Sequence, residues 1–165
     1  MPEITVVHEL DCDEDTFWHG CTFNEEFNRQ LYLETLKFPG YDGSNVDSAT
    51  TVTRKVRIDP PLTGLPGPVK KVLGDRFAYV EEGTFDKATK RYRFKVTPTT
   101  MPEKTTTTGE MWCEPRGEKK IARFAKVFVQ VKVFAVGGMI EDKIVSDLKA
   151  SYDAAAKFTN DWVKR

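Results

Sequence analysis

The sequence predicts an α+β fold in which an antiparallel β-sheet curls around one long C-terminal helix. Between residues 50 and 134, apolar and polar side chains alternate in several segments separated by short turn sequences. This alternation is the period of a half-buried strand. Adjacent strands joined by short turns pair antiparallel, and such a sheet needs only one covered face. Residues 136–165 have helical periodicity, so they are expected to supply that cover.

The expected C-terminal helix carries one continuous apolar stripe. Its members recur at intervals of three and four, and they are Ile140, Ile144, Leu148, Tyr152, Ala155, Phe158 and Trp162. Most charged residues of the segment fall outside the stripe, where they can stay in water. A helix of about 25 residues is roughly 37 Å long, enough to lie across a whole sheet. It needs such a partner, because helices in proteins depend mainly on packing of their apolar face.

The first third of the chain predicts one strand and two short helices. Residues 4–10 alternate as a strand, and the acidic segment 11–15 suits a helix start. Residues 16–19 are expected to form a short helix that Gly20 ends. Asn24 is expected to cap a second helix, and the breakers of residues 39–43 are expected to stop it and turn the chain.

The remaining segments predict a run of consecutive strands within one domain, residues 1–165. The expected strands are 50–58, 76–85, 91–97, 104–114 and 121–134. Turns at 86–90 and 115–117 join neighbouring strands, and a proline- and glycine-rich loop at 59–68 leads into a helical turn at 69–73. No repeat or linker composition divides the chain.

Composition excludes several classes of protein. The chain has 165 residues, with 25 Lys and Arg against 25 Asp and Glu, so it lacks the basic bias of a nucleic-acid-binding protein. Three cysteines, Cys12, Cys21 and Cys113, favour reduced thiols over a disulfide framework. The N-terminal residues do not have the pattern of a signal peptide, and no apolar run is long enough for a membrane span. We expect a cytoplasmic protein that is a monomer or a weak dimer.

Three stretches resemble a known superfamily. They are Val-His-Glu-Leu-Asp at 7–11 followed by Thr-Phe-Trp at 16–18, Gly-Glu-Met-Trp-Cys-Glu-Pro at 109–115, and Val-Lys-Val-Phe-Ala-Val-Gly-Gly-Met-Ile-Glu at 131–141. Together with the order of elements they resemble the START-like superfamily (SRPBCC, Bet v 1-like and polyketide cyclase-like proteins). The chain is most similar to its uncharacterised small bacterial members. The resemblance covers essentially the whole chain.

The resemblance implies a helix-grip fold, a curved antiparallel sheet wrapped around a long C-terminal helix with two short helices after the first strand. It also implies a cavity between sheet and helix, whereas the residues alone favour a filled core. The function expected from it is binding, sequestration or transfer of a lipid or other bulky hydrophobic ligand. The alternatives are a polyketide cyclase or aromatase-like enzyme and a regulatory protein with a filled cavity. Fold alone does not choose among these three functions, so enzymatic activity is left open. A binding protein without enzymatic activity is the expected one.

Alternation along the strands and the helical stripe give the expected ligand-binding residues. These are Val56, Phe77, Tyr79, Tyr92, Phe94, Met111, Val127, Val129, Ile144, Leu148 and Tyr152. For an enzyme, the titratable groups to test are His8, Glu81, Tyr79 and Tyr92.

Four polar residues stand in register with inward-facing positions: His8, Arg54, Glu81 and Arg123. A buried charge is costly unless paired, so we expect two or more of them to meet each other or the polar head of a ligand. Arg54 and Arg123 have the forked geometry that binds a carboxylate or phosphate. The alternative is a bulge or strand end that turns each into solvent.

The segment 60–74 is the expected gate, with Pro66, Val69 and Leu73 at its centre. Such a loop between strands can cap the mouth of a cavity or make transient contact with an anionic lipid surface. The alternative is an ordinary connection whose apolar turn packs against the edge of the sheet.

No metal, cofactor or catalytic motif is expected. His8, Cys12, His19 and Cys21 do not have the spacing of a compact zinc site. The sequence also has no Gly-x-Ser-x-Gly elbow, Walker A loop or Rossmann glycine triplet. Cys113 paired with a histidine as nucleophile and base is less expected than a buried, inert thiol.

Overall fold

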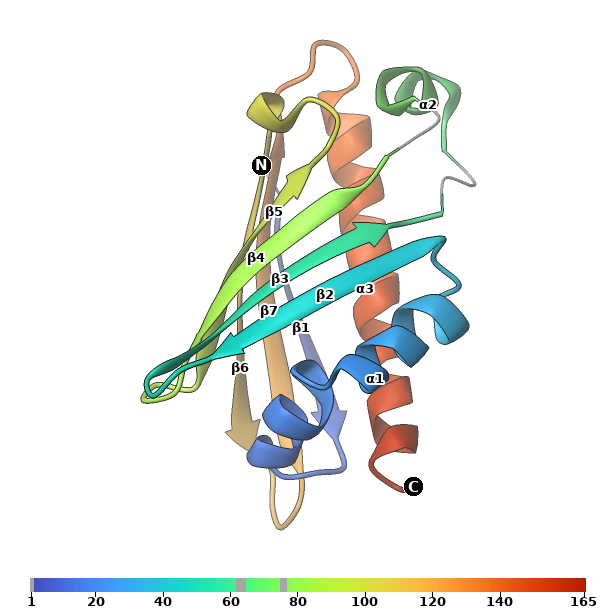
Figure 1. Ribbon diagram of the computed structural model, residues 1–165. Helices are drawn as coiled ribbons and strands as arrows, with labels where there is room; N and C mark the ends of the chain where they lie inside the picture. Colours follow the sequence, from blue (N-terminus) through green and yellow to red (C-terminus); the bar gives the residue numbers. More distant parts are fainter. Residues whose placement is uncertain (1, 62–64, 75–76) are drawn as a thin grey trace.

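The computed structural model describes residues 2–61, 65–74 and 77–165, and all described strands belong to one antiparallel sheet. The order across the sheet is β1-β7-β6-β5-β4-β3-β2. The strands are β1 (Glu3–Leu10), β2 (Gly40–Asp47), β3 (Thr51–Asp59), β4 (Tyr79–Asp86), β5 (Arg91–Pro98), β6 (Thr105–Pro115) and β7 (Ile121–Val131). The helical elements are η1 (Thr16–Thr22), α1 (Glu25–Arg29), η2 (Gln30–Thr35), α2 (Gly67–Leu73), η3 (Pro102–Lys104) and α3 (Gly137–Trp162). The sheet curves around α3, which confirms the predicted helix-grip fold (Figure 1).

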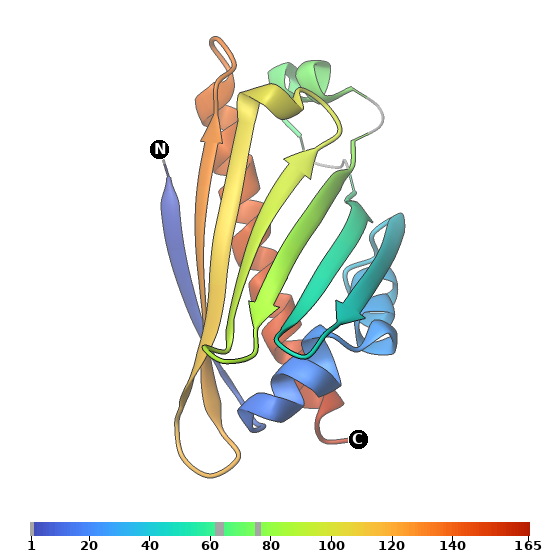
Figure 2. The same cartoon turned by 60° about the vertical axis from the view of Figure 1, so that its left-hand side comes forward.

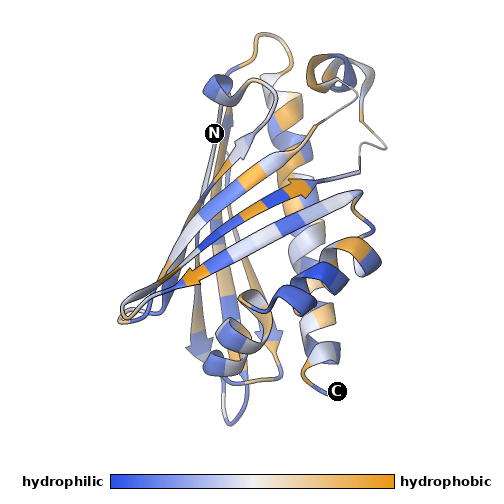
Figure 3. Ribbon diagram, viewed as in Figure 1, coloured by the Kyte–Doolittle hydropathy of each residue, from blue (hydrophilic) through white to orange (hydrophobic). Residues whose placement is uncertain are grey.

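The long helix α3 lies on the inner face of the sheet, mainly against β1 and β7 (Figure 2). Alternate residues of β3 and β7 are buried on this face, and the hydropathy pattern of β3 in Figure 3 follows the same period. The C-terminal end of α3 is held by the short helices. The Phe27 ring packs edge-on against Phe158, with 5.0 Å between the centroids, and the Trp162 indole N–H donates to the carbonyl of Gly20 at 3.2 Å.

The two short helical segments after β1 confirm one expected cap and correct one expected end. The Asn24 side chain accepts a hydrogen bond from the backbone N–H of Phe27 at 3.1 Å, so Asn24 caps α1 as predicted. The prediction that Gly20 ends the first helix is wrong, because η1 continues to Thr22 with the wider π-helical turn. Burial of Trp18 and Cys21 on the core side of η1 outweighs the low helix propensity of the glycine.

Strand β2 occupies a segment in which the sequence predicted turns. The breakers Pro39-Gly40 and Asp42-Gly43 favour a turn, yet Gly40–Asp47 pairs with β3 along its whole length, from Gly40 opposite Asp59 to Asp47 opposite Val52. Pairing with the neighbouring strand therefore outweighs the local preference of these residues. As the last strand of the sheet, β2 tolerates glycine and polar residues that a central strand would not.

Two strand boundaries also differ from the prediction. The expected start of the fourth strand at Arg76 lies outside the described residues, and β4 begins at Tyr79, so Phe77 precedes the strand. The seventh strand ends at Val131 instead of Phe134. The chain must turn there to bring α3 back across the sheet. Ala135 takes a left-handed conformation (φ 69°), and Phe134 is left 96% exposed.

Gly109 on β6 gives room for an aromatic ring on the inner face of the sheet. A Cβ atom at this position would collide with the Phe94 ring, which lies on the paired strand β5. We predict that Gly109→Ala lowers the free energy of unfolding by about 1–3 kcal/mol, measured by urea denaturation, because overpacking forces the ring off its position.

Gly138→Ala is the matched control. A Cβ at Gly138, near the start of α3, meets no atom within 4 Å. The change should be neutral or raise the stability by up to about 1 kcal/mol, the difference in helix propensity. Equal effects of the two substitutions would contradict the packing role given to Gly109.

Candidate functional site

The apolar stripe of α3 is only partly covered along its length, and even Trp162 at its C-terminal end is half-buried. Ile140 and Phe158 are buried, whereas Ile144, Leu148 and Tyr152 are only half-buried although they pack against the core. Across from the helix, the sheet also carries half-buried inner-face residues, namely Tyr79, Val96 and Met111. The interior therefore keeps accessible apolar surface between the middle of α3 and the sheet.

The expected ligand-binding residues divide into two groups in the structure. Five are fully buried in the packed core: Val56, Tyr92, Phe94, Val127 and Val129. Six keep accessible surface: Phe77, Tyr79, Met111, Ile144, Leu148 and Tyr152. Only the second group can touch a ligand without rearrangement of the core, and its binding role stays a prediction.

A small cavity of about 70 Å³ lies between α2, the segment around η3 and the N-terminal half of α3. Four expected site or gate residues line it: Val69, Leu73, Phe77 and Ile144. Pro66, expected in the gate, is exposed and does not line it. Pro60, Pro61 and Leu65 of the expected gate segment also line it, as do Ile140 of the expected stripe and Val131 of the last strand. The sequence did not predict the other lining residues, which are Pro98, Thr100, Met101, Thr105, Lys143 and Asp147. Most of these lie in loops or on the helix, where strand alternation gives no information.

Arg54 and Glu81, two of the four expected polar residues, form a buried ion pair. An Nη of Arg54 donates to Oε2 of Glu81 at 3.3 Å, and the Tyr92 hydroxyl donates to the same oxygen at 2.7 Å. The other Nη donates to the side-chain oxygen of Asn28 at 3.4 Å. Arg54 is only 8% exposed. The expectation that members of this set pair with each other is thereby confirmed for these two residues.

All five tyrosines of the chain interact electrostatically with one or both members of this ion pair. Burial raises the pKa of each phenol above its ordinary value, and the charge of Glu81, of Arg54 or of both acts on every one: Tyr32, Tyr41, Tyr79, Tyr92 and Tyr152. Tyr32 and Tyr41 stack with 5.0 Å between their centroids. Neither tyrosine was predicted at the site from the sequence, since Tyr32 lies on η2 and Tyr41 lies in the unpredicted strand β2.

His8 and Arg123, the other two expected polar residues, meet on neighbouring strands β1 and β7. Arg123 donates to Nδ1 of His8 at 2.8 Å and to the backbone carbonyl of Tyr152 at 3.1 Å. The Nε2 atom of His8 lies 2.6 Å from the carboxylate of Asp153 on α3. This geometry fits the neutral imidazole that carries its proton on Nε2. The alternative of four side chains turned into bulk water is therefore wrong for both pairs.

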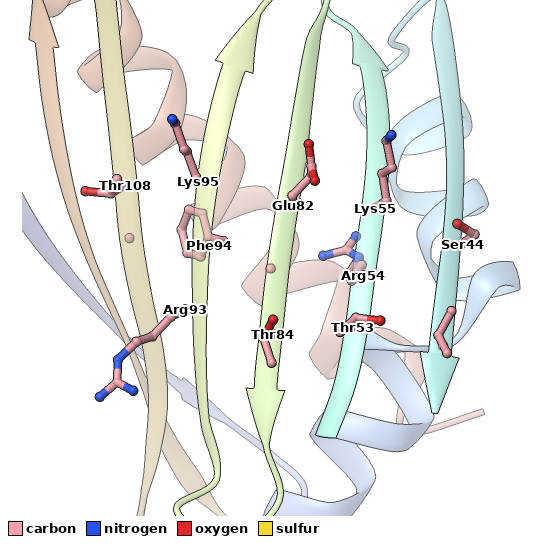
Figure 4. Close-up of a pocket in the computed structure, with 13 residues that line it drawn as sticks. Ser44, Thr53, Arg54, Lys55, Glu82, Thr84, Arg93, Phe94, Lys95 and Thr108 are labelled. Carbon is pink, nitrogen blue, oxygen red and sulfur yellow. The ribbon is translucent and has the colours of Figure 1, made fainter. Parts of the chain in front are cut away.

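The outer face of the sheet has a wide, open depression of about 630 Å³ across β2 to β6. Figure 4 shows exposed polar side chains on successive strands, among them Lys55, Glu82 and Lys95, with α3 on the far side of the sheet. Charges of both signs alternate there and most of the lining side chains are solvated. This face lacks the enclosed apolar lining of a small-molecule site.

The cysteines sit in environments that suppress thiolate formation. Burial raises the pKa of Cys12 to about 11 and that of Cys21 to about 12. Burial likewise raises the pKa of Cys113. A thiol with a raised pKa is a poor nucleophile at neutral pH. Within residues 2–61, 65–74 and 77–165, no group of three or more His, Cys, Asp or Glu side chains has the arrangement to hold a metal ion.

The raised tyrosine pKa values predict a loss of stability at high pH. Between the unfolded pKa of about 10 and the higher folded value, the native state keeps a proton that the unfolded state has released. The stabilisation is therefore complete below pH 10 and lost above it. We expect the free energy of unfolding to fall by up to about 1.4 kcal/mol per pH unit for each such tyrosine.

Two measurements check this expectation. Denaturation curves at pH 9, 10 and 11 give the slope, and absorbance near 295 nm should show less tyrosinate in native than in urea-unfolded protein at pH 10.5. Identical tyrosinate absorbance in the two states would contradict the buried positions of the phenols.

No helix of the described residues is long and apolar enough to cross a membrane.

A comparison with curated proteins finds no match. Solved structures, by contrast, show the same fold over nearly the whole chain. The aromatase/cyclase ZhuI from Streptomyces sp. R1128 superimposes with a TM-score of 0.66 at 7% identity, covering 99% of this chain and 94% of that one.

Two further structures extend this likeness. A START superfamily protein from Mycobacterium smegmatis gives a TM-score of 0.61 at 12% identity, with 98% and 97% of the two chains covered. Norcoclaurine synthase from Thalictrum flavum gives 0.63 at 14% identity, with 94% and 84% covered. At such identities the likeness shows the START-like, polyketide cyclase-like fold alone. A family model matches residues 5–163, and the chain therefore belongs to the family described as "Protein of unknown function (DUF2505)".

Proposed function

We propose that this protein binds a bulky apolar molecule between its sheet and the middle of α3, and that it sequesters or transfers that molecule. The observation that carries the proposal is the incomplete cover of the stripe at Ile144, Leu148 and Tyr152, opposite equally half-buried residues of the sheet. Covering this surface with a ligand is favourable by about 25 cal/mol per Å² of apolar area. The START-like fold that the chain shares with its structural neighbours is compatible with this proposal.

The first test is native mass spectrometry of freshly purified protein, followed by organic extraction. A discrete co-purifying apolar compound would support the proposal and identify its chemistry. A bare protein mass, together with no binding of added apolar probes, would favour the regulatory protein with a filled cavity.

We propose that α2 is the entrance to this interior. The cavity beneath it, about 70 Å³, holds only about two water molecules at roughly 30 Å³ each, so a bulky ligand must displace a covering element. The element α2 is one short helix of seven residues, and Val69 is its single fully buried side chain. Its attachment therefore rests on few contacts, which is what a movable cover requires.

The double substitution Val69→Ser and Leu73→Ser should speed exchange of an apolar probe such as N-phenyl-1-naphthylamine. We expect at least about a tenfold faster release in stopped-flow fluorescence, because the loss of apolar contacts weakens the closed position of α2. Far-UV circular dichroism verifies that the fold is kept.

Val46→Ser is the control, since Val46 is 66% exposed on the outer face of the sheet. It should leave the release rate unchanged. Equal release rates for the double variant and the unaltered protein would show that α2 is an ordinary connection.

We propose that the same end of the molecule makes transient contact with anionic membranes. Figure 1 places α2, η3 and the β7–α3 turn together at this end. The turn exposes Phe134, and Met139 in the first turn of α3 is exposed beside it in sequence. Four exposed lysines lie on these segments: Lys70, Lys71, Lys104 and Lys132. The exposed acids on them are Glu103 and Asp142, so positive charge is in excess among the described residues.

Phe134→Ser should weaken binding to phosphatidylserine-containing vesicles by about tenfold in a sedimentation assay, because insertion of a phenyl ring contributes about 1.5–3 kcal/mol. Binding should also fall with added salt, as lysine attraction to anionic lipid is screened. Val46→Ser again serves as the control. Equal partition onto phosphatidylcholine vesicles alone, or no effect of Phe134→Ser, would overturn the membrane contact.

The enzyme alternative has one observation in its favour. Glu81 accepts hydrogen bonds from the Tyr92 phenol and the Arg54 guanidinium inside the fold, and two of the structural neighbours are described as an aromatase/cyclase and a synthase. Chemical change of the extracted compound during incubation with the protein, abolished by Glu81→Gln with binding retained, would select this alternative over a carrier.

A further inference from the structure

Arg123 is a buried cation without a carboxylate partner. The residue is 2% exposed, and no Asp or Glu among the described residues lies within 4.0 Å of its guanidinium. Its hydrogen-bond acceptors are the neutral Nδ1 of His8 and the carbonyl of Tyr152, and its Nε–H has no partner in the part of the chain that the structure describes. A buried charge that lacks a counter-charge is a destabilising feature that calls for a specific explanation.

Arg54 provides the internal comparison, because its Nε–H also lacks a partner among the described residues but its guanidinium has a carboxylate partner in Glu81. Burial opposes its charge as well, but Glu81 and the surrounding tyrosines more than offset this and raise the pKa of Arg54 above its ordinary value. Burial of the Arg123 guanidinium outweighs the charges around it and lowers its pKa. Asp153 lies on the far side of the His8 ring and is 72% exposed. Its charge acts on Arg123 and opposes the effect of burial, but water weakens it and it does not offset the burial.

The surroundings of Arg123 lead toward the accessible interior. The guanidinium carbon lies 5.1 Å from the centroid of the Tyr152 ring, and Tyr152 is one of the half-buried residues in the middle of α3. Cys113, which is opposite Arg123 on β6, is also half-buried. From Tyr152 the apolar stripe continues through Leu148 to Ile144, about 12 Å along the helix, toward the cavity beneath α2.

We propose that Arg123 binds the carboxylate of an amphipathic acid whose apolar tail lies along the α3 stripe toward α2. This assignment rests on the proposed ligand-binding function and names its substrate class. Because the Nε–H of Arg123 is buried in the ligand-free protein, the half-buried Tyr152 side chain must move aside before the carboxylate can accept its hydrogen bond and supply the missing counter-charge. The planar guanidinium suits a carboxylate better than an ammonium group does. The neutral Arg54–Glu81 pair, by contrast, offers no net charge to such a head group.

The test compares two probes with the same tail, cis-parinaric acid and its methyl ester, by fluorescence titration of the full-length protein near pH 8. We expect the acid to bind at least about tenfold more tightly than the ester, since a hydrogen bond to a charged group is lost with the ester. Arg123→Gln should weaken binding of the acid to the level of the ester and leave the ester unchanged. Arg123→Lys keeps the charge and should keep part of the preference.

Arg93→Gln is the matched control, because Arg93 is an arginine of the outer sheet face with a 68% exposed side chain. It should keep the full preference for the acid. Equal affinities of the unaltered protein for acid and ester would overturn the role of Arg123 and leave the proposed function standing. Failure to bind either probe would overturn both. The comparison on the unaltered protein needs no variant, so it decides the matter even if Arg123→Gln folds poorly.

Thermal melting of the ligand-free variants separates a binding role from a structural one. An arginine kept for its ligand destabilises the empty protein, so Arg123→Met should melt at the same or a higher temperature than the unaltered protein. A clearly lower melting temperature, with acid preference retained in Arg123→Lys and Arg123→Gln, would show that Arg123 serves the fold alone.

Discussion

The packing of α3 along only one side of the curved sheet is the constraint on which the rest of the structure depends. The helix is held mainly by β1 and β7, and its C-terminal end is fixed by Phe27 and the carbonyl of Gly20. Because the sheet curls away from the helix toward β2, the middle of α3 cannot reach the inner face of β3 to β5 as closely as it reaches β7. Interior surface remains accessible there, bordered by the half-buried Tyr79 and Tyr152 together with Val96, Met111, Ile144 and Leu148. The fold thus produces a partly open core as a consequence of curvature and of where one helix is anchored.

The two buried arginines of this core differ in how the free-energy cost of burying their charge is offset. Arg54 and Glu81 neutralise each other, and Tyr92 and Asn28 supply further hydrogen bonds, so the pair can persist without any ligand. Arg123 has only neutral acceptors for its hydrogen bonds. The Nε–H groups of both arginines lack a partner among the described residues, so the two differ in the counter-charge that Glu81 gives to Arg54 alone. Proteins keep such unfavourable groups at functional positions and offset their cost elsewhere. The contrast between the two arginines therefore distinguishes a structural ion pair from a site that is complete only when occupied.

The parts of the fold that the sequence predicted are those set by local periodicity. Alternation along β3, β5 and β7 gave their inner faces, and the stripe on α3 gave its buried side. The alternation along β3 and β7 also predicted that the side chains of Arg54 and Arg123 face inward. The sequence failed where a tertiary contact decides the outcome. Strand β2 forms because it pairs with β3, and this pairing brings Tyr41 close to the Arg54–Glu81 ion pair. Tyr32 lies on the helical element η2, and the sequence pattern does not indicate which side of η2 faces the sheet. The walls of the small cavity come from loops, where side-chain direction follows packing alone.

The hydrogen bonds of Glu81 bear on the choice between carrier and enzyme. Both of its donors, the Arg54 guanidinium and the Tyr92 hydroxyl, bind the same carboxylate oxygen, Oε2. These two hydrogen bonds fix the carboxylate against the guanidinium and the phenol, so its side chain is held in one orientation inside the fold. A group held in this way suits either function, because it can orient a bound ligand or stand at a fixed position beside a reacting atom. The compound that binds between the sheet and α3 decides between the two, because catalysis also requires a reacting atom within hydrogen-bond reach of Glu81.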